Sequence, residues 1–419
     1  MSLRGLATAA VCTTLIVSAC SSPQERARTI HEVADDEVPV PEAVTSVSEI
    51  GWEWRPDEEE TALAVHAQSR GAVIELEDGL VGLQGDTGNE LWRYRLPEAT
   101  ALSTSFSPSG EHALVAASDE PAVLLDTSTG AVVAEDIDWD GEAHLLDHTR
   151  LLHHRGEATE ALFTVSDLES GKTLWRQETP KTCSGGGPSR LVSRLLHSEA
   201  IVLLLHCSEN TSQEALRAPE SDTVNALVAL SPNDGRDLWR QESADSEGRG
   251  LVSALMLQGT LAADLPGEEG WLIIDPVDGT LIAESPKPVL AVGEDTYLAG
   301  PDPWAEDPTH ELRTFDGEVA ASVTLSEDRW AGDTPETAIG LPEQLISVDM
   351  ERGSPEDAVN AVVTPWDGGR DDVITATTTG TASRIDPGRL LSVPGAVLVY
   401  VPVDHAADID SVEHVVALR

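Results

Sequence analysis

From about residue 60 onward, the apolar residues form short runs that alternate with turns. Runs such as 123–125, 227–230 and 271–274 are continuously apolar, which is typical of strands that are covered on both faces. Stretches with helical periodicity longer than about ten residues are hard to find. The 33 glycines and 25 prolines are spread through the chain and supply frequent turns. The pattern predicts a nearly all-β protein.

A glycine-ended turn recurs along the chain and is followed by a short strand that often carries Leu-Trp-Arg. The clearest copies span 86–93, 170–176 and 234–240. The turn glycines are Gly88, Gly130, Gly171, Gly235, Gly279, Gly317 and Gly368, with spacings of 42, 41, 64, 44, 38 and 51 residues. Most of these spacings match one four-stranded blade of a β-propeller.

Tryptophans after these turns are predicted to pack between blades. Trp92, Trp175 and Trp239 belong to the clearest copies, and Trp54 lies in a similar segment at 50–55. Each offers a large apolar ring and an indole N–H that can donate to a backbone carbonyl.

The two ends of the repeat region complement each other. Residues 50–55 resemble a strand that follows a turn, whereas 414–419 resemble a strand that precedes one. We therefore expect the N- and C-terminal strands to pair and close the ring, which removes exposed strand edges. The count favours eight blades over residues 47–419, and seven remains an alternative because 325–375 is irregular.

The N-terminus has the pattern of a lipoprotein export signal. Arg4 precedes an apolar stretch of about a dozen residues, too short to span a bilayer, and Val17-Ser18-Ala19-Cys20 resembles a lipobox. We expect cleavage of 1–19, lipidation of Cys20 and an extracytoplasmic protein anchored to the cell membrane. Residues 20–46 are polar, acidic and proline-bearing, and are expected to form a disordered tether.

Charge and cysteine content narrow the possible functions. The chain has 26 basic and 74 acidic residues and a net charge of −48, which argues against nucleic-acid binding because phosphates would be repelled. With Cys12 removed and Cys20 acylated, Cys183 and Cys207 remain. In an oxidising compartment they are expected to form a disulfide; two unpaired thiols are the alternative.

The turn–Leu-Trp-Arg repeat resembles the PQQ-like, quinoprotein-type β-propeller family, which includes BamB-like envelope lipoproteins. The resemblance covers roughly 50–419 and implies a propeller. It also implies either a binding scaffold or a quinoprotein dehydrogenase, because one fold serves many functions. Quinoprotein dehydrogenases of this kind commonly have a pair of adjacent cysteines at the cofactor, and this chain has none.

One acidic loop has the spacing of a calcium-binding loop. Its acids are Asp136, Asp138, Asp140, Glu142 and Asp147, with Gly141 at the position of the sharp turn. Calcium is therefore a possible structural ligand, although an acidic loop between blades explains the same pattern. His153 and His154 adjoin on a predicted strand and should face opposite ways, which argues against a shared metal.

No catalytic motif stands out, and neither catalytic residues nor an organic cofactor is expected. The leading hypothesis is a non-catalytic scaffold that binds envelope proteins or surface components through the propeller face. The alternatives are an extracytoplasmic enzyme, either a PQQ-dependent dehydrogenase or a lactonase-like hydrolase, and a ligand-binding sensor.

Overall fold

The structure is a computed structural model of the whole chain. It describes residues 29–35, 38–58, 60–97, 102–118, 120–156, 161–180, 183, 189–207, 223–245, 253–265, 270–301, 308–325, 337–349, 358–377, 388–405 and 409–419. The predicted signal peptide, Cys20 and the first part of the predicted tether lie outside these ranges.

Six antiparallel sheets each contain four strands that are consecutive in the chain. Three of them are formed by β7 (Leu102–Phe106), β8 (His112–Ala117), β9 (Ala122–Asp126) and β10 (Val132–Ile137); β11 (His144–Asp147), β12 (Arg150–Arg155), β13 (Leu162–Asp167) and β14 (Thr173–Glu178); and β15 (Ser189–His197), β16 (Ala200–Cys207), β17 (Thr223–Leu230) and β18 (Asp237–Asp245). The other three are formed by β19 (Ala254–Leu257), β20 (Thr260–Asp264), β21 (Trp271–Ile274) and β22 (Leu281–Ser285); β23 (Val289–Val292), β24 (Thr296–Ala299), β25 (Thr309–Thr314) and β26 (Val319–Thr324); and β27 (Ala338–Gly340), β28 (Gln344–Asp349), β29 (Ala358–Pro365) and β30 (Asp372–Thr377).

The seventh sheet has nine strands and contains both ends of the ring. Its strands are β1 (Ile30–Glu32), β2 (Ile50–Trp54), β3 (Ala62–Gln68), β4 (Gly71–Leu76), β5 (Gly79–Gln84), β6 (Glu90–Arg95), β31 (Arg389–Val393), β32 (Ala396–His405) and β33 (Ile409–Leu418). One residue pair, Ala62 with Val412, joins β3 to β33. We interpret this sheet as two blades, β3–β6 and β31–β32–β33–β2, with β1 added at the edge, so that the described strands other than β1 form eight four-stranded units. We number these units blades 1 to 8 from β3 onward.

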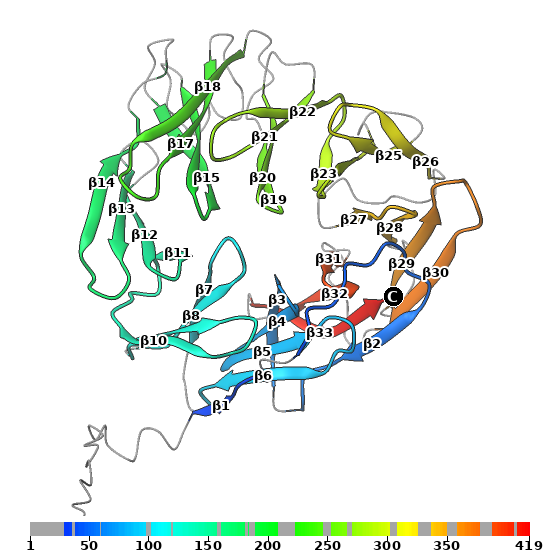
Figure 1. Cartoon of the computed structure of the whole chain (residues 1–419), viewed down its shortest axis with the longest axis horizontal. Helices are drawn as coiled ribbons and strands as arrows, with labels where there is room; N and C mark the ends of the chain where they lie inside the picture. Colours follow the sequence, from blue (N-terminus) through cyan, green and yellow to red (C-terminus); the bar gives the residue numbers. More distant parts are fainter. Residues whose placement is uncertain are drawn as a thin grey trace, which may run out of the picture.

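The sheets are arranged around a central axis, which confirms the predicted all-β propeller (Figure 1). The first strand of each blade lies nearest the axis and the fourth lies at the rim. Because the strands are antiparallel, the turns between strands one and two and between strands three and four lie on the same face of the ring. We call this the turn face and the opposite one the loop face.

The predicted closure by the chain ends is confirmed. β2 pairs antiparallel with β33 as the outer strand of blade 8, and Ile50 lies opposite Leu418. The amides of Ser48 and Glu49 both donate to the carbonyl of Arg419, at 2.6 and 3.0 Å. The last blade is therefore completed by a strand from the beginning of the chain.

The repeat tryptophans join each blade to the next. Trp92, on the outer strand of blade 1, is 1% exposed and donates its indole N–H to the carbonyl of Thr127, 2.8 Å away in a turn of blade 2. The same turn contains Gly130, whose φ is +69°, and a Cβ at that position would lie 2.7 Å from the Trp92 ring. Glycine is therefore required both by the backbone conformation and by the close approach of the indole.

Three further tryptophans repeat this contact with the same spacing. In each case the indole donates to the residue three positions before the turn glycine of the next blade: Trp52 to Gly85 (2.8 Å), Trp175 to Pro232 (2.8 Å) and Trp239 to Pro276 (2.9 Å). The sequence prediction named Trp54 for the closing strand. Trp54 is partly buried against the core cluster of blades 8 and 1, and the neighbouring Trp52 makes the turn contact.

Other blades have alanine where these have tryptophan, four residues after the turn glycine. The alanines are Ala134, Ala283 and Ala321, and the turn glycines of the blades that follow are Gly171, Gly317 and Gly368. A Cβ on any of these three glycines would meet nothing within 4 Å. The indole contact therefore varies from blade to blade.

The segment predicted to be a disordered tether is ordered over most of its described length, which corrects that prediction. β1 pairs with β6 as a fifth strand of blade 1, with His31 opposite Tyr94. Further along, the Glu42 carbonyl accepts from the Gly395 amide at 2.9 Å, and the half-buried Val44 packs against a core cluster of blades 7 and 8. Backbone pairing and these apolar contacts hold the segment against the turn face, which its polar composition did not indicate.

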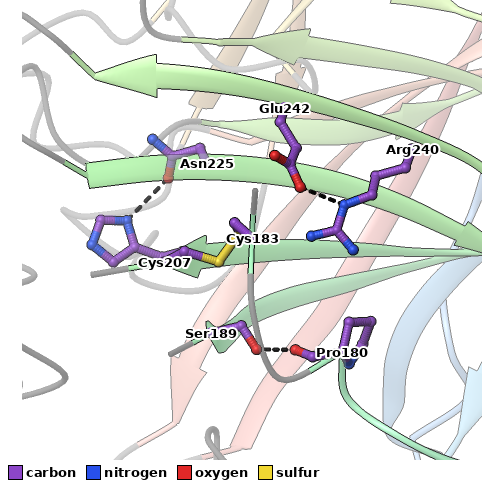
Figure 2. The surroundings of a disulfide bond; sticks show 8 residues. Pro180, Cys183, Ser189, Cys207, Asn225, Arg240 and Glu242 are labelled. Atoms are coloured by element: carbon purple, nitrogen blue, oxygen red, sulfur yellow. Dashed lines mark hydrogen bonds and ion pairs between the residues drawn. A yellow bond between two sulfur atoms is a disulfide. The ribbon is translucent and has the colours of Figure 1, made fainter. Parts of the chain in front are cut away.

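Cys183 and Cys207 form a disulfide, as the sequence predicted (Figure 2). Their Cα atoms are 6.0 Å apart, and both residues are buried in the core cluster between blades 3 and 4. Beside the bond, the His206 ring contacts the side-chain oxygen of Asn225 at 3.0 Å. The disulfide ties the segment before blade 4 to the end of its second strand.

Matched glycine substitutions test the indole contact. Gly130→Ala and Gly171→Ala introduce the same strain, since the φ angles are +69° and +65°, but only Gly130→Ala also collides with an indole. We expect Gly130→Ala to be more destabilising by about 1–3 kcal/mol. Chemical unfolding of the two variants measures the difference, and equal losses would show that the Trp92 contact contributes nothing.

Candidate functional site

The central channel is lined by the first strands of the blades, and its wall differs from one side to the other. Neighbouring first strands contact each other, as β7 does with β11 and β23 with β27. In blades 5 to 8 these strands are largely aliphatic, whereas in blades 2 to 4 they carry serine, threonine, histidine and arginine. One channel thus has an apolar side and a polar side.

An aliphatic cavity of about 480 Å³ occupies the turn-face end of the apolar side. It is lined by β19, β23, β27, β31 and the end of β3, together with residues of the adjoining turns and strands. Its wall includes Leu255, Met256, Leu257, Ala291, Leu390 and Leu391. Most of these are only half-buried, although Met256, Leu257, Ala291 and Leu391 also pack against the core clusters between blades. Such an apolar hollow with few polar groups suits the binding of an apolar group.

A hydrogen-bonded cluster lies between blades 1 and 2 on the polar side. The His66 ring contacts the Glu75 carboxylate at 3.0 Å and stacks on Phe106 with ring centroids 3.8 Å apart. The Thr104 hydroxyl also donates to Glu75. Burial alone would raise the pKa of Glu75, but the hydrogen bonds from His66 and Thr104 hold it below its ordinary value. Glu75 is therefore ionised and fully engaged.

A second polar cluster lies between blades 3 and 4. The Arg194 guanidinium contacts the Nε2 atom of His144, and His154 lies close enough to feel the charge of Arg194. Burial, followed by the charge of Arg194, lowers the pKa of both histidines. Both imidazoles are therefore neutral at pH 7, and Arg194 carries the only charge of this cluster.

The histidine pair behaves as the strand period predicts. His153 contacts the Ser166 hydroxyl at 3.0 Å, while the neighbouring His154 lies beside Arg194. Within the described ranges, no three histidine, cysteine, aspartate or glutamate side chains are placed to hold a metal ion. The two histidines thus belong to different surroundings.

Only three of the five acidic side chains that suggested a calcium site lie around one cavity. Asp136, Asp138 and Asp140 line a cavity of about 670 Å³, but Glu142 and Asp147 do not. The loop is followed by β11, which carries Asp147 to the turn face, about 10 Å along the strand. There Asp147 accepts hydrogen bonds from the Thr149 amide (2.7 Å) and from Arg150.

Asp140 is also engaged within the protein. Its carboxylate accepts hydrogen bonds from the Glu142 and Ala143 amides, at 3.0 and 3.1 Å. Burial would raise its pKa, but these amides, with the charges of His153 and Arg155, lower it. The described geometry therefore does not bring the five predicted ligands around one point.

A buried histidine lies behind the cavity wall. His310 is on β25, two residues before Leu312, which lines the cavity. It is fully buried, and neither ring nitrogen has a hydrogen-bond partner in the part of the chain that the structure describes. Burial, followed by the charge of Lys287, lowers its pKa to about 4. His310 is therefore neutral near pH 7.

Sequence reasoning found the blades, the disulfide and the acidic loop, but missed both channel features. The aliphatic wall comes from strands spread over five blades, so no local motif marks it. Arg194 has a weak signal: residues 179–198 contain no aspartate or glutamate, although the chain has 74. Nothing in the sequence indicates that His144 and His154 lie beside Arg194, because the three residues are brought together only when blades 3 and 4 pack.

The chain is similar to several solved structures, all at low sequence identity. The chain is similar to BamB from Moraxella catarrhalis, with a TM-score of 0.45 and 14% identity over 89% of this chain and 98% of that one. It is also similar to a quinohemoprotein alcohol dehydrogenase from Comamonas testosteroni, with a TM-score of 0.40 and 12% identity over 88% and 76% of the two chains. Sqt1 from Saccharomyces cerevisiae gives a TM-score of 0.42 and 10% identity over 90% and 99%.

These similarities concern the fold alone. No protein-family model matches the chain, and no curated protein matches it either. Within the part of the chain that the structure describes, no helix is long and apolar enough to cross a membrane.

His310 predicts an acid-dependent loss of stability. The pKa of His310 is about 4 in the folded protein against an ordinary value of 6.5. As pH falls from 6.5 to 4, the histidine is therefore protonated in the unfolded chain but not in the folded one. His310 should therefore lower the free energy of unfolding by up to about 3 kcal/mol between pH 7.5 and 4.

His310→Leu removes this proton uptake and the two unpartnered nitrogens. We expect the variant to be at least as stable as wild type at pH 7.5 and to lose less stability on acidification. Comparing both proteins first at pH 7.5 isolates the packing effect of the substitution. Parallel stability–pH curves would contradict a neutral, buried His310.

Proposed function

We propose that the protein is a membrane-anchored, extracytoplasmic scaffold that binds another envelope protein without catalysing a reaction. The observation that carries this proposal is the aliphatic cavity at the turn-face end of the channel. Side chains such as Leu255, Met256 and Leu391 are half-buried there, so binding an apolar group would remove further apolar surface from water. An aliphatic wall supports binding better than proton transfer, which needs titratable groups within reach.

A protein partner would use the cavity as an anchor pocket. Protein interfaces concentrate their binding energy in a few side chains that fill pockets near the centre of the contact. A leucine, methionine or phenylalanine of the partner has the apolar character that this wall requires. The net charge of −48 would favour a partner with basic residues around that anchor and speed its approach.

The N-terminal segment supports a short connection to the membrane. Only nine residues separate Cys20 from Ile30 in β1, and this length of chain spans about 35 Å at most. β1 lies at the outer edge of blade 1, and the following residues run along the turn face. A lipidated Cys20 would therefore hold the rim of blade 1 close to the bilayer.

We further propose that the scaffold needs no bound quinone or calcium. A quinone site requires a stacking surface and matched polar groups in the channel. Here Trp92, Trp175 and Trp239 are engaged between blades, where their indoles contact turns. The described channel wall beside the cavity is aliphatic and fits an apolar partner better than a polar cofactor.

Site-specific crosslinking tests the scaffold function. A photoreactive amino acid at Met256 lies in the cavity wall, and the same residue at Leu281, 47% exposed on an outer strand, serves as the control. In native membranes we expect a discrete envelope-protein adduct from position 256 and none of that size from 281. Adding Leu391→Asp should abolish the adduct.

The same experiment can contradict the proposal. Equal adducts from both positions, or an adduct that survives Leu391→Asp in a folded protein, would place the partner elsewhere. Thermal unfolding of the Leu391→Asp variant shows whether the fold is retained.

The anchor is tested separately. Cys20→Ala should prevent lipidation and release the protein from the membrane fraction, or leave an uncleaved precursor there. Membrane fractionation and the mass of the mature N-terminal peptide measure this. An unchanged mature mass and normal fractionation would contradict lipidation at Cys20.

A further inference from the structure

No carboxylate among the described residues pairs with Arg194. Several other arginines of the ring do form ion pairs, as Arg93 does with Glu60 (2.8 Å) and Arg313 with Glu311 (2.6 Å). Arg194 is half-buried, and its one hydrogen-bonded contact in the described structure is the neutral ring of His144.

The strand register explains why Arg194 meets histidines. A register shift in β15 between Leu191 and Ser193 changes which side chains share a face. Leu191, Arg194 and Leu196 then face blade 3, since both leucines pack in the cluster between blades 3 and 4. His144 on β11 and His154 on β12 lie on the facing side of blade 3.

His154 adds a second unsatisfied group. Its Nε2 atom is buried and has no hydrogen-bond partner among the described residues, while its ring packs on Phe163 with centroids 5.2 Å apart. A buried polar atom without a partner is costly, and so is an unpaired guanidinium that is partly removed from water. Both costs fall if an anion that accepts hydrogen bonds lies between them.

Electrostatics sets the charge of that anion. Among the described residues, the charges that lower the pKa of His144 are those of Arg194 and His154. The charge that lowers the pKa of His154 is that of Arg194. Other half-buried histidines feel acids, as His197 feels Glu199 and Asp275. Among the described residues, the surroundings of Arg194 therefore carry a charge of about +1, which one monoanion neutralises.

We propose that Arg194, His144 and His154 form a binding site for the carboxylate group of an organic monoacid in the channel wall between blades 3 and 4. A planar carboxylate matches the forked N–H groups of a guanidinium. His144 contacts one terminal nitrogen of Arg194, and the remaining N–H groups can meet the carboxylate oxygens. The Nε2 atom of His154, as an N–H tautomer, supplies a further donor. This site is separate from the protein-binding cavity and does not depend on the lipid anchor.

Calorimetric titration of the full-length protein in nanodiscs, with empty nanodiscs as the blank, tests the site. The probes are hexanoate and its uncharged counterpart hexanol. We expect saturable binding of hexanoate and no saturable binding of hexanol. Arg194→Gln should weaken hexanoate binding about 10- to 100-fold, the range for a lost charge-assisted hydrogen bond, and His154→Phe should weaken it several-fold.

Arg236→Gln is the matched control. Arg236 also belongs to blade 4, but it is largely exposed on a turn and lies 3.5 Å from Asp234. Its substitution should leave hexanoate affinity unchanged. Arg194→Gln removes an unpaired charge, so its ligand-free melting temperature should equal or exceed that of wild type. Should Arg194→Gln fail to fold, Arg194→Lys keeps the charge, loses the fork, and should still weaken binding.

Chain length identifies the source of the carboxylate. Equal affinities for propionate and hexanoate indicate a small free acid, whereas tighter hexanoate binding that Leu391→Asp abolishes indicates an acyl chain reaching the aliphatic cavity. Both outcomes support the site. Absence of saturable carboxylate binding, equal binding of hexanol, or unchanged affinity in a folded Arg194→Gln variant would overturn it.

Discussion

The packing of an indole on the turn of the next blade is the interaction on which the outer part of the ring depends. Blades are flat sheets that diverge with distance from the axis, so the space between neighbours widens toward the rim. A tryptophan on the outer strand fills that space, and its N–H satisfies a turn carbonyl that would otherwise be left unpaired. At the contact between Trp92 and Gly130, the indole also restricts the sequence of the turn, because any side chain at position 130 would collide with the ring. Where Ala134 replaces tryptophan, the next turn glycine faces open space.

A closed ring also needs its first and last blades to be joined and their strand edges covered, and the N-terminal segment contributes to both. β2 completes blade 8, and its Trp52 contacts the turn of blade 1 in the same way as the other repeat tryptophans. The residues before β2 run along the turn face, and β1 covers the outer edge of blade 1. An uncovered edge strand is prone to pair with other chains. One segment therefore both completes blade 8 and covers the outer edge of blade 1.

The asymmetry of the channel follows from how first strands are packed. Their side chains face neighbouring blades at the sides and the channel at the front, so interblade packing does not require every position to be aliphatic. Blades 5 to 8 nevertheless present Leu257, Ala291 and Leu391 to the cavity, whereas blades 3 and 4 present His144 and Arg194. Neither composition is required for ring stability, and this freedom allows the channel wall to become a binding surface.

The sequence alone determined the architecture, because blade structure is local. Each hairpin turn, its positive-φ glycine and the apolar strand beside it lie within about 40 residues, so the repeat and the disulfide pair could be recognised directly. Closure was also predictable, since the two chain ends carried complementary parts of one blade. On the closing strand the sequence pointed to Trp54, which does pack against the cluster of blades 8 and 1, but it did not show that Trp52 is the residue whose indole reaches the turn.

The tertiary structure decided everything that depends on contacts between blades. The spacing of Asp136 to Asp147 fits a calcium loop, yet β11 carries Asp147 away from the other acids. The polar segment before residue 47 has no periodicity, but it gains order from hydrogen bonds to turns that are far away in sequence. Arg194 and His144 are 50 residues apart and meet because a register shift in β15 turns the arginine toward blade 3. Such sites arise from the geometry of the closed ring, which no local sequence pattern encodes.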